Sequence, residues 1–179
     1  MASFLTALAA SIAGGATGAF GGTFGALQLA KRTDRRTVTD QLVAEFFSAD
    51  FLKHRIAVHE LRTAVDSQAV SVASVAGGFW DPGRPDYYTG PPVEPGELNQ
   101  HQHLEAYIGY IVRLARALEG RRLDQDSARA ALGMHLSWHD RIVQRVASVT
   151  AQQAREHPSV VPDWTLKAEL VHLKLVPDR

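Results

Sequence analysis

Apolar and polar residues follow one another along most of the chain with the spacing of amphipathic helices. The clearest stripe runs from Leu104 to Leu118, where apolar side chains recur at i, i+3, i+4 and i+7 and charged residues take the remaining positions. Comparable stripes predict helices over residues 37–47, 50–65 and about 124–153. The segment after Trp164 fits either a short helix or a strand, and we favour a helix. The pattern therefore predicts an all-α fold.

Polar residues at the expected helix starts, together with a short connection, set several boundaries. Ser48 or Asp50 offers an N-cap for the second helix, and Asp124 or Asp126 offers one for the long helix that follows. Only residues 121–123 separate that helix from the one before it. We expect two helices joined by so short a turn to pack as antiparallel neighbours.

Glycines mark two helix ends. Gly120 ends the helix over 104–118. Residues 68–78 alternate valine with small polar residues for a few positions, but a lone strand would have no partner. We therefore interpret this segment as the fraying end of the preceding helix, closed by Gly77 and Gly78.

Residues 77–100 form the longest predicted loop. They hold five of the eight prolines, which excludes a regular element through the segment. Its aromatic side chains have two interpretations: they contact a partner, or they pack the loop onto the helices, which we favour. The aromatic residues that could meet a partner are Trp80, Tyr87 and Tyr88.

The first thirty residues carry no charged side chain, and they predict a membrane anchor. The run from Phe4 to Ala30 would extend roughly 40 Å as a helix, enough to cross a bilayer with tilt. Because it is rich in alanine and glycine, the prediction depends on length and lack of charge. The alternatives are a cleaved signal peptide, which would normally begin with positive charge, and a helix of a soluble protein. We expect an anchor over 1–30 and one helical domain over 31–179.

Four cations follow the uncharged run directly: Lys31, Arg32, Arg35 and Arg36. Positive charge favours the cytoplasmic side, so we expect a single-pass protein of the cytoplasmic membrane, with its N-terminus outside and its domain in the cytoplasm. The same cations suit contact with anionic lipid headgroups.

Glycines within the run have the spacing that lets two membrane helices approach closely. Three of them form a GxxxGxxxG pattern and two repeat the spacing on a neighbouring face. We therefore expect a homo-oligomer through the span, although an alanine- and glycine-rich segment shows such spacings by composition alone. The glycines are Gly14, Gly18 and Gly22, with Gly21 and Gly25.

Composition excludes several classes of function. The 19 basic and 19 acidic residues balance, so nothing indicates nucleic acid as a partner. The chain has no cysteine, which excludes disulfides and thiolate chemistry. No phosphate-binding loop, dinucleotide fingerprint or nucleophile elbow occurs, so we predict no catalytic residue and no cofactor.

Two of the eight histidines have metal-ligand spacing. His135 and His139 lie four residues apart on one predicted helix and could ligate one ion. The glutamate of the HExxH motif is missing, because Leu136 follows the first histidine. Both also fall within an apolar stripe, where histidines are more often hydrogen-bonded core residues, which is the interpretation we favour.

The layout resembles a group of single-span, membrane-anchored helical proteins of bacteria and phages, a family of unknown function. The similar region covers roughly residues 40–145, and the long loop looks like an insertion in it. The resemblance implies an all-α cytoplasmic domain and brings no catalytic residue. The matching features are Phe-Phe-Ser-x-x-Phe at 46–51, Glu105 with Tyr107, Gly-x-x-Leu-Asp at 120–124, and Trp138.

Together these inferences favour a membrane-anchored helical interaction or scaffold protein with an unidentified protein partner. Two alternatives stay open. One is a metal-dependent enzyme or binding module that uses the helix of His135 and His139. The other is a glycine-zipper oligomer that acts in the membrane as a pore or effector.

Overall fold

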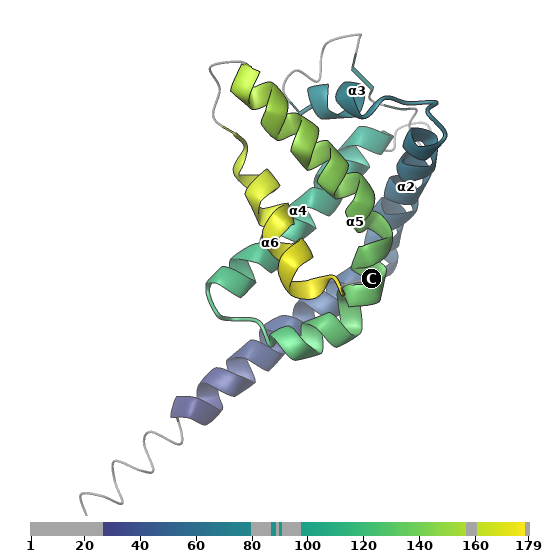
Figure 1. Ribbon diagram of the computed structural model, residues 1–179. Helices are drawn as coiled ribbons and strands as arrows, with labels where there is room; N and C mark the ends of the chain where they lie inside the picture. Colours follow the sequence, from purple (N-terminus) through teal and green to yellow (C-terminus); the bar gives the residue numbers. More distant parts are fainter. Residues whose placement is uncertain (1–26, 80–86, 89, 91–97, 157–160, 178–179) are drawn as a thin grey trace, which may run out of the picture.

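The computed structural model describes residues 27–79, 87–88, 90, 98–156 and 161–177. Helices account for 82% of these residues and no strand occurs among them, which confirms the predicted all-α class. A leading helix spans residues 27–46. The helices labelled in Figure 1 are α2 (Ala49–Asp66), α3 (Val72–Gly77), α4 (Gln100–Glu119), α5 (Gln125–Glu156) and α6 (Asp163–Leu175).

Side-chain caps start the helices as the sequence predicts, with one extension. Ser48 Oγ accepts a hydrogen bond from the Phe51 N–H at 3.2 Å and begins α2. The helix α4 starts four residues before its apolar stripe, because Asn99 and Gln102 form a reciprocal capping box. Asp124 caps α5 by accepting from the Ser127 N–H at 3.3 Å.

The prediction that residues 68–78 are a fraying helix end is wrong. The helix α2 ends at Asp66, and Gln68 follows in a left-handed conformation with a φ of 63°. The chain then begins the separate helix α3, because Ser71 Oγ accepts a hydrogen bond from the Ser74 N–H at 3.0 Å. A left-handed residue between two caps turns the chain, so the segment forms a second element.

The expectation that α4 and α5 pack as antiparallel neighbours is also wrong. Among the helices α2 to α6, α4 packs mainly on α6 and α2, while α5 packs on α6, α3 and α2. The helix α6 packs on both α4 and α5, and these contacts replace the direct α4–α5 packing that we expected (Figure 1). Where α4 and α5 do approach, the rings of Tyr107 and His139 lie 5.2 Å apart.

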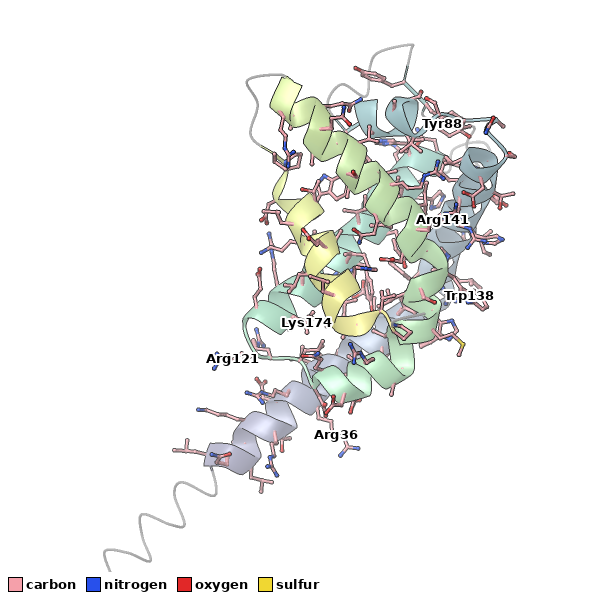
Figure 2. All side chains as sticks on the ribbon, in the orientation of Figure 1. Arg36, Tyr88, Arg121, Trp138, Arg141 and Lys174 are labelled. Atoms are coloured by element: carbon pink, nitrogen blue, oxygen red, sulfur yellow. The ribbon has the colours of Figure 1, made fainter. Side chains whose placement is uncertain are left out.

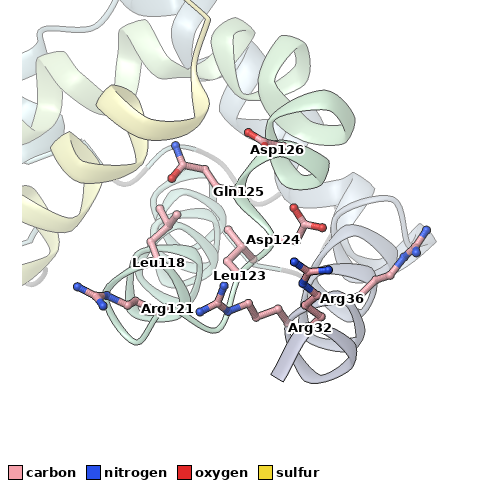
Figure 3. A pocket seen from close by; sticks show the side chains of 9 residues that line it. Arg32, Arg36, Leu118, Arg121, Leu123, Asp124, Gln125 and Asp126 are labelled. Atoms are coloured by element: carbon pink, nitrogen blue, oxygen red, sulfur yellow. The ribbon is translucent and has the colours of Figure 1, made fainter. Parts of the chain in front are cut away.

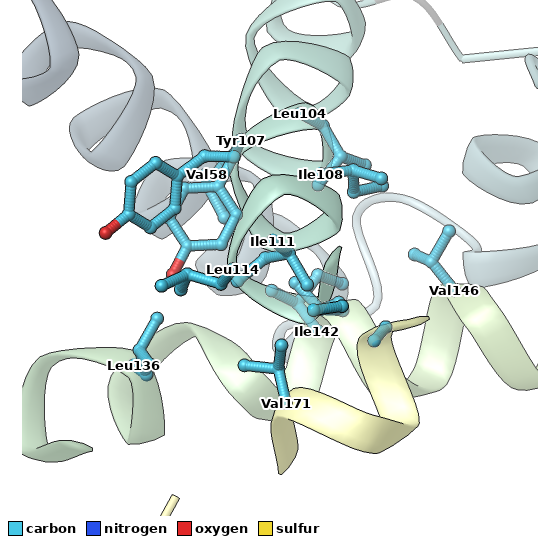
Figure 4. Packing of buried hydrophobic residues seen from close by; sticks show 14 of the residues in the cluster. Val58, Leu104, Tyr107, Ile108, Ile111, Leu114, Leu136, Ile142, Val146 and Val171 are labelled. Atoms are coloured by element: carbon cyan, nitrogen blue, oxygen red, sulfur yellow. The ribbon is translucent and has the colours of Figure 1, made fainter. Parts of the chain in front are cut away.

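The core lies where α2, α4, α5 and α6 meet (Figure 4). Of the predicted α4 stripe, Leu104 and Tyr107 are at most 1% exposed, and Ile111 is 4% exposed. Burial of each such side chain contributes roughly 1.5–3 kcal/mol to folding. The core thus confirms the helical stripe from which the fold was predicted.

A glycine lets the end of α6 sit against α5. A Cβ at Gly133 of α5 would lie 2.8 Å from the carbonyl oxygen of Leu175, closer than side chains normally come. Gly133 is itself buried, and Leu175 is completely buried. Close approach of the two backbones therefore requires glycine at position 133.

The leading helix leaves the body of the domain at its N-terminal end (Figure 1). Residues 27–37 are exposed throughout, whereas Thr39 and Phe46 are at most 1% exposed. The docked half is held by Tyr110, whose hydroxyl donates to the Leu42 carbonyl at 3.0 Å. Positions 30 and 31, the predicted border between anchor and domain, lie within one uninterrupted helix.

None of the helices among the described residues combines the length and apolarity that a bilayer crossing requires. Of the predicted span from Phe4 to Ala30, only the last four residues are described. The five glycines of the predicted packing face lie outside the described residues; they are Gly14, Gly18, Gly21, Gly22 and Gly25.

Candidate functional site

Arginines from two distant parts of the chain line one hollow beside the exposed part of the leading helix. Figure 2 labels one arginine from each part, Arg36 and Arg121. The hollow measures about 570 Å³. Three of its arginines come from the exposed part of the leading helix, and the fourth, Arg121, comes from the turn between α4 and α5. We call this hollow the arginine pocket; its lining is Arg32, Arg35, Arg36, Leu118, Arg121, Leu123, Asp124, Gln125 and Asp126.

Arg121 occupies a strained backbone position. The α4 C-terminus closes with two backbone bonds, from the Arg122 N–H to the Ala117 carbonyl at 2.8 Å and from the Arg121 N–H to the Leu118 carbonyl at 3.0 Å. This is a Schellman pattern, and its left-handed position falls on Arg121, with a φ of 52°. A non-glycine residue there costs roughly 1–2 kcal/mol.

Gly120 is the C-cap that ends α4, as the sequence predicts, but it is not the left-handed residue of the turn. Gly120 has a φ of −71°, in the right-handed region that any residue adopts. The residue that needs glycine's conformational freedom is Arg121, one position later. Strained backbone positions cluster at functional sites, although Gln68 shares the left-handed conformation at a position outside the arginine pocket.

A buried threonine fixes the two halves of the arginine pocket relative to each other. Thr39 of the leading helix is 1% exposed, and its hydroxyl accepts a hydrogen bond from the Asp124 N–H at 2.9 Å. The same hydroxyl donates to the Arg35 carbonyl at 2.8 Å. The hydroxyl is therefore satisfied as a donor within its own helix and as an acceptor across the junction.

Positive charge predominates in the arginine pocket. Its lining carries four guanidinium groups and two carboxylates. Asp124 is engaged as the α5 cap: hydrogen bonds from the Ser127 N–H and hydroxyl lower the pKa of its carboxyl, and the nearby Arg36 lowers it further. In Figure 3, Arg36 lies next to Asp124, Arg32 reaches across the hollow toward Leu123, and Arg121 stands at the opposite rim.

Two larger hollows border α5 and α6, and they differ from the arginine pocket in charge. They measure about 900 and 730 Å³. The first is lined by Arg155 and Glu169 among polar and apolar residues, and the second places Asp140 with two arginines. Neither gathers charge of one sign as strongly, so the arginine pocket is the better candidate for a charged ligand.

Only part of the predicted basic cluster lines the arginine pocket. Lys31, the first residue of the cluster, is exposed on the leading helix and does not line the arginine pocket. Sequence reasoning missed Arg121, because nothing along the chain places residue 121 beside residue 32. The available signal was the Arg121–Arg122 pair in a turn of five residues between two long helices.

His135 and His139 lie on α5 as predicted, but their surroundings differ. His139 is 4% exposed; its Nδ1 faces the His135 carbonyl oxygen and its Nε2 faces the Arg55 carbonyl oxygen, each at 3.2 Å. The His135 ring lies edge-on to Phe47, with centroids 5.0 Å apart. Burial lowers the pKa of His139 to about 4 despite the two carbonyls.

A further histidine contact joins α2 to α4. The Nδ1 atoms of His54 and His103 are 2.9 Å apart, so one ring donates the shared proton and the other accepts it. Within the described ranges, no group of three or more His, Cys, Asp or Glu side chains is arranged to hold a metal ion. Metal binding by His135 and His139 stays an untested alternative, and no third ligand accompanies them in the described part of the chain.

The described aromatic residues of the loop region pack on the helices, as we favoured. The Tyr87 ring lies directly against Gly77, where a Cβ would come within 2.2 Å of it. The Tyr88 hydroxyl donates to Gln100 Oε1 at 2.6 Å, and the Phe79 ring lies 4.6 Å from that of His101. Trp80 lies outside the described residues.

An exposed apolar patch lies where the end of the leading helix and α5 meet. Phe47 is 46% exposed, Met134 68% and Trp138 53%. The His135 ring joins two of them, because it contacts Phe47 and lies 5.9 Å from the Trp138 ring. We call these four residues the aromatic patch, of which Figure 2 labels Trp138.

Comparisons of the chain with protein-family models, with curated proteins and with solved structures find no match in any of the three. The resemblance to membrane-anchored helical proteins of bacteria and phages therefore stays a prediction.

Proposed function

We propose that this protein is a membrane-anchored helical interaction protein, with the uncharged N-terminal run as the anchor and the helical domain held at the bilayer surface. The observation that carries the proposal is the leading helix, which is continuous from residue 27 to 46. Its first eleven residues project from the domain and its last residues are buried in it. A rigid connection of this kind transmits the position of an anchor to the domain.

The charge pattern of the leading helix supports the same proposal. Lys31, Arg32, Arg35 and Arg36 are all exposed on the projecting part, directly after the uncharged run. Cations at this place suit the anionic headgroup layer on the cytoplasmic side of a membrane. We therefore propose that the domain lies in the cytoplasm and the N-terminus outside.

The aromatic patch supports an interaction role for the domain. Exposed Trp and aromatic side chains beside Arg are typical of the residues that dominate protein interfaces. Arg55 lies 5.5 Å from the Phe47 ring, and Arg62 Nη1 donates to the Trp138 carbonyl at 2.6 Å. We propose as occupant an amphipathic helix of another protein, with acidic residues beside its apolar face.

Capture of partners with three versions of the full chain tests this surface. Trp138→Asp should lose a partner that the unchanged chain retains, and the retained partner should carry an acidic amphipathic segment. Lys174→Asp, at an exposed position of α6, serves as control and should leave capture unchanged. A partner captured equally by all three versions would exclude the aromatic patch as its binding surface.

Self-association through the glycines of the anchor is part of the proposal. Replacing Gly18 by leucine would fill the close-contact face without adding charge. Crosslinking in membranes should then yield oligomers from the unchanged chain and mainly monomer from Gly18→Leu. Monomer from both chains would contradict self-association through the anchor.

Extraction of membranes with alkaline carbonate tests the anchor. We expect the full chain to stay with the membrane. Gly18→Arg places a charge near the middle of the run at a cost of roughly 2.5–3.5 kcal/mol, so this variant should move toward the soluble fraction. Ala130→Arg, at an exposed position of α5, should behave like the unchanged chain. Release of the unchanged chain contradicts the proposal.

A further inference from the structure

We infer that the arginine pocket binds a phosphate group. It brings Arg32, Arg36 and Arg121 around one hollow, together with Arg35. The planar guanidinium fork matches phosphate oxygens in pairs, which is why arginine predominates in phosphate recognition. A hollow of about 570 Å³ holds a phosphate with a small organic group attached.

The ligand chemistry follows from the balance of charges. Four guanidinium groups face two carboxylates, and one of these, Asp124, already accepts from the Ser127 N–H and hydroxyl as the cap of α5. Cationic charge therefore remains for a ligand. A doubly ionisable phosphate monoester fits this excess better than a carboxylate, because it presents more acceptor oxygens with more charge.

Because of Arg121, the arginine pocket is more than a run of cations along one helix. It lies about 90 positions from the leading helix in sequence, and it reaches the pocket only because the α4–α5 turn docks there. Its backbone is held in a left-handed conformation that glycine would adopt without strain. Arginine at this position therefore gives up stability relative to glycine and adds a cation to the pocket.

Phosphate of this kind has two sources, and only one depends on the proposed membrane function. An anionic lipid headgroup would reach the arginine pocket from the bilayer, whereas a soluble phosphate ester would reach it from solution. The inference that the lipid is the source rests on the proposed anchor. The inference that the pocket recognises phosphate does not.

Titration with inorganic phosphate tests the pocket independently of a membrane. The probe is added to the full chain in neutral detergent micelles, and heat or chemical-shift changes report binding. Arg121→Gly keeps the turn and should weaken phosphate binding by roughly tenfold or more, the effect of losing one charged hydrogen bond. Lys31→Ala is the matched control and should leave phosphate binding unchanged. No phosphate binding, or equal losses in both variants, would overturn the inference.

Flotation with vesicles then identifies the source. Phosphatidylcholine vesicles without anionic lipid report the anchor, and binding to them should not depend on Arg121. In vesicles that also contain phosphatidate, any cation near the surface contributes about fivefold to partitioning, so Lys31→Ala sets the size of the general effect. A larger loss for Arg121→Gly supports the pocket with lipid as its ligand. If Arg121→Gly and Lys31→Ala lose vesicle binding equally, while only Arg121→Gly loses binding in the phosphate titration, the ligand of the pocket is a soluble phosphate ester.

These outcomes separate the two proposals. If the chain fails to float with neutral vesicles but binds phosphate through Arg121, the anchor is wrong and the pocket stands. If it floats but phosphate binding ignores Arg121, the anchor stands and the pocket is wrong. Thermal unfolding of Arg121→Gly serves as the folding control, because relief of backbone strain should leave this variant at least as stable as the unchanged chain.

Discussion

The hydroxyl of Thr39 accepts a hydrogen bond from the backbone N–H of Asp124 across 85 residues of chain, at 2.9 Å. This contact fixes the leading helix against the turn that carries Arg121. The turn also approaches the leading helix through Arg122 and Asp34, whose charged atoms are 4.0 Å apart, but that pair is exposed and contributes little. Thr39 therefore holds the two walls of the arginine pocket together, although its own side chain does not line the pocket.

Thr39→Val keeps the shape of the side chain and removes its hydrogen bonds. We expect the free energy of unfolding to fall by about 1–3 kcal/mol, because the Asp124 N–H loses its acceptor at a partly buried site. Phosphate binding should weaken as well, since the two walls of the arginine pocket are no longer tied together. Urea denaturation and phosphate titration of the full chain in micelles measure the two effects.

Thr37→Val is the matched control for this experiment. Thr37 is exposed and its hydroxyl donates only to the Thr33 carbonyl one turn earlier, at 3.0 Å. Its replacement should change stability by no more than about 0.5 kcal/mol. If the two threonine variants lost equal free energy of unfolding and equal phosphate binding, the Thr39–Asp124 hydrogen bond would not be what holds the arginine pocket together.

Arg121→Gly should raise the stability of the fold. The left-handed φ of 52° suits glycine, and relief of the strain should add roughly 1 kcal/mol to the free energy of unfolding. Gln68→Gly is the control, because Gln68 has a φ of 63° and lies outside the arginine pocket. Both variants should resist urea better, but only Arg121→Gly should lose phosphate. A destabilised Arg121→Gly would argue that the arginine side chain supports the turn itself.

Gly133→Ala should destabilise the domain, because the new Cβ would lie 2.8 Å from the Leu175 carbonyl oxygen. The backbone of α6 has to move, at a typical cost of about 1–3 kcal/mol. Gly109→Ala, in the middle of α4, meets nothing closer than Arg113 at 3.9 Å and should stabilise by roughly 0.5–1 kcal/mol. Thermal unfolding should therefore shift in opposite directions for the two substitutions, and a shift in the same direction would contradict the placement of α6.

Acid should weaken the fold through His139. Its pKa in the folded protein is about 4, below the ordinary value, so the unfolded chain takes up the proton first. Stability is unaffected by this residue above about pH 6.5 and falls as the pH drops toward 4, by up to ~1.4 kcal/mol per pH unit. Burial also lowers the pKa of His54 and His101, which adds to the fall with the same sign.

His139→Gln tests this assignment. The amide cannot gain a proton, so the fall in stability between pH 6.5 and 4 should become shallower than in the unchanged chain. The range from pH 7 to 8 is the internal reference, where the two chains should have parallel stability curves. An equally steep acid loss in the variant would assign it to other groups.

Local patterns in the sequence predicted most of the helices. The stripe through Leu104 and Tyr107 is the buried face of α4, and Ser48 caps α2 as proposed. Local chemistry succeeds here because apolar spacing and caps act within a few residues. It failed at the connection over residues 67–71 between α2 and α3, because its left-handed residue, Gln68, leaves no trace in the hydrophobic pattern.

The arginine pocket could be predicted only in part. The cluster on the leading helix is visible as consecutive cations, and three of its four members line the pocket. Arg121 and Thr39 were not predictable, because their roles depend on how the α4–α5 turn docks against residues some 80 positions earlier. The place of α6 between α4 and α5 was missed for the same reason, since packing order is a property of the whole fold.

Chemical labelling of single cysteines tests the membrane-anchored account most directly. The chain has no cysteine, so Ser3→Cys, Gly18→Cys and Thr33→Cys each provide one reactive site. With a membrane-impermeant maleimide, we expect Ser3→Cys to react in intact cells, Thr33→Cys to react only after the membrane is opened, and Gly18→Cys to stay protected in both. Equal reaction of Gly18→Cys and Thr33→Cys in opened cells would contradict the account, because residue 18 would then lie in water.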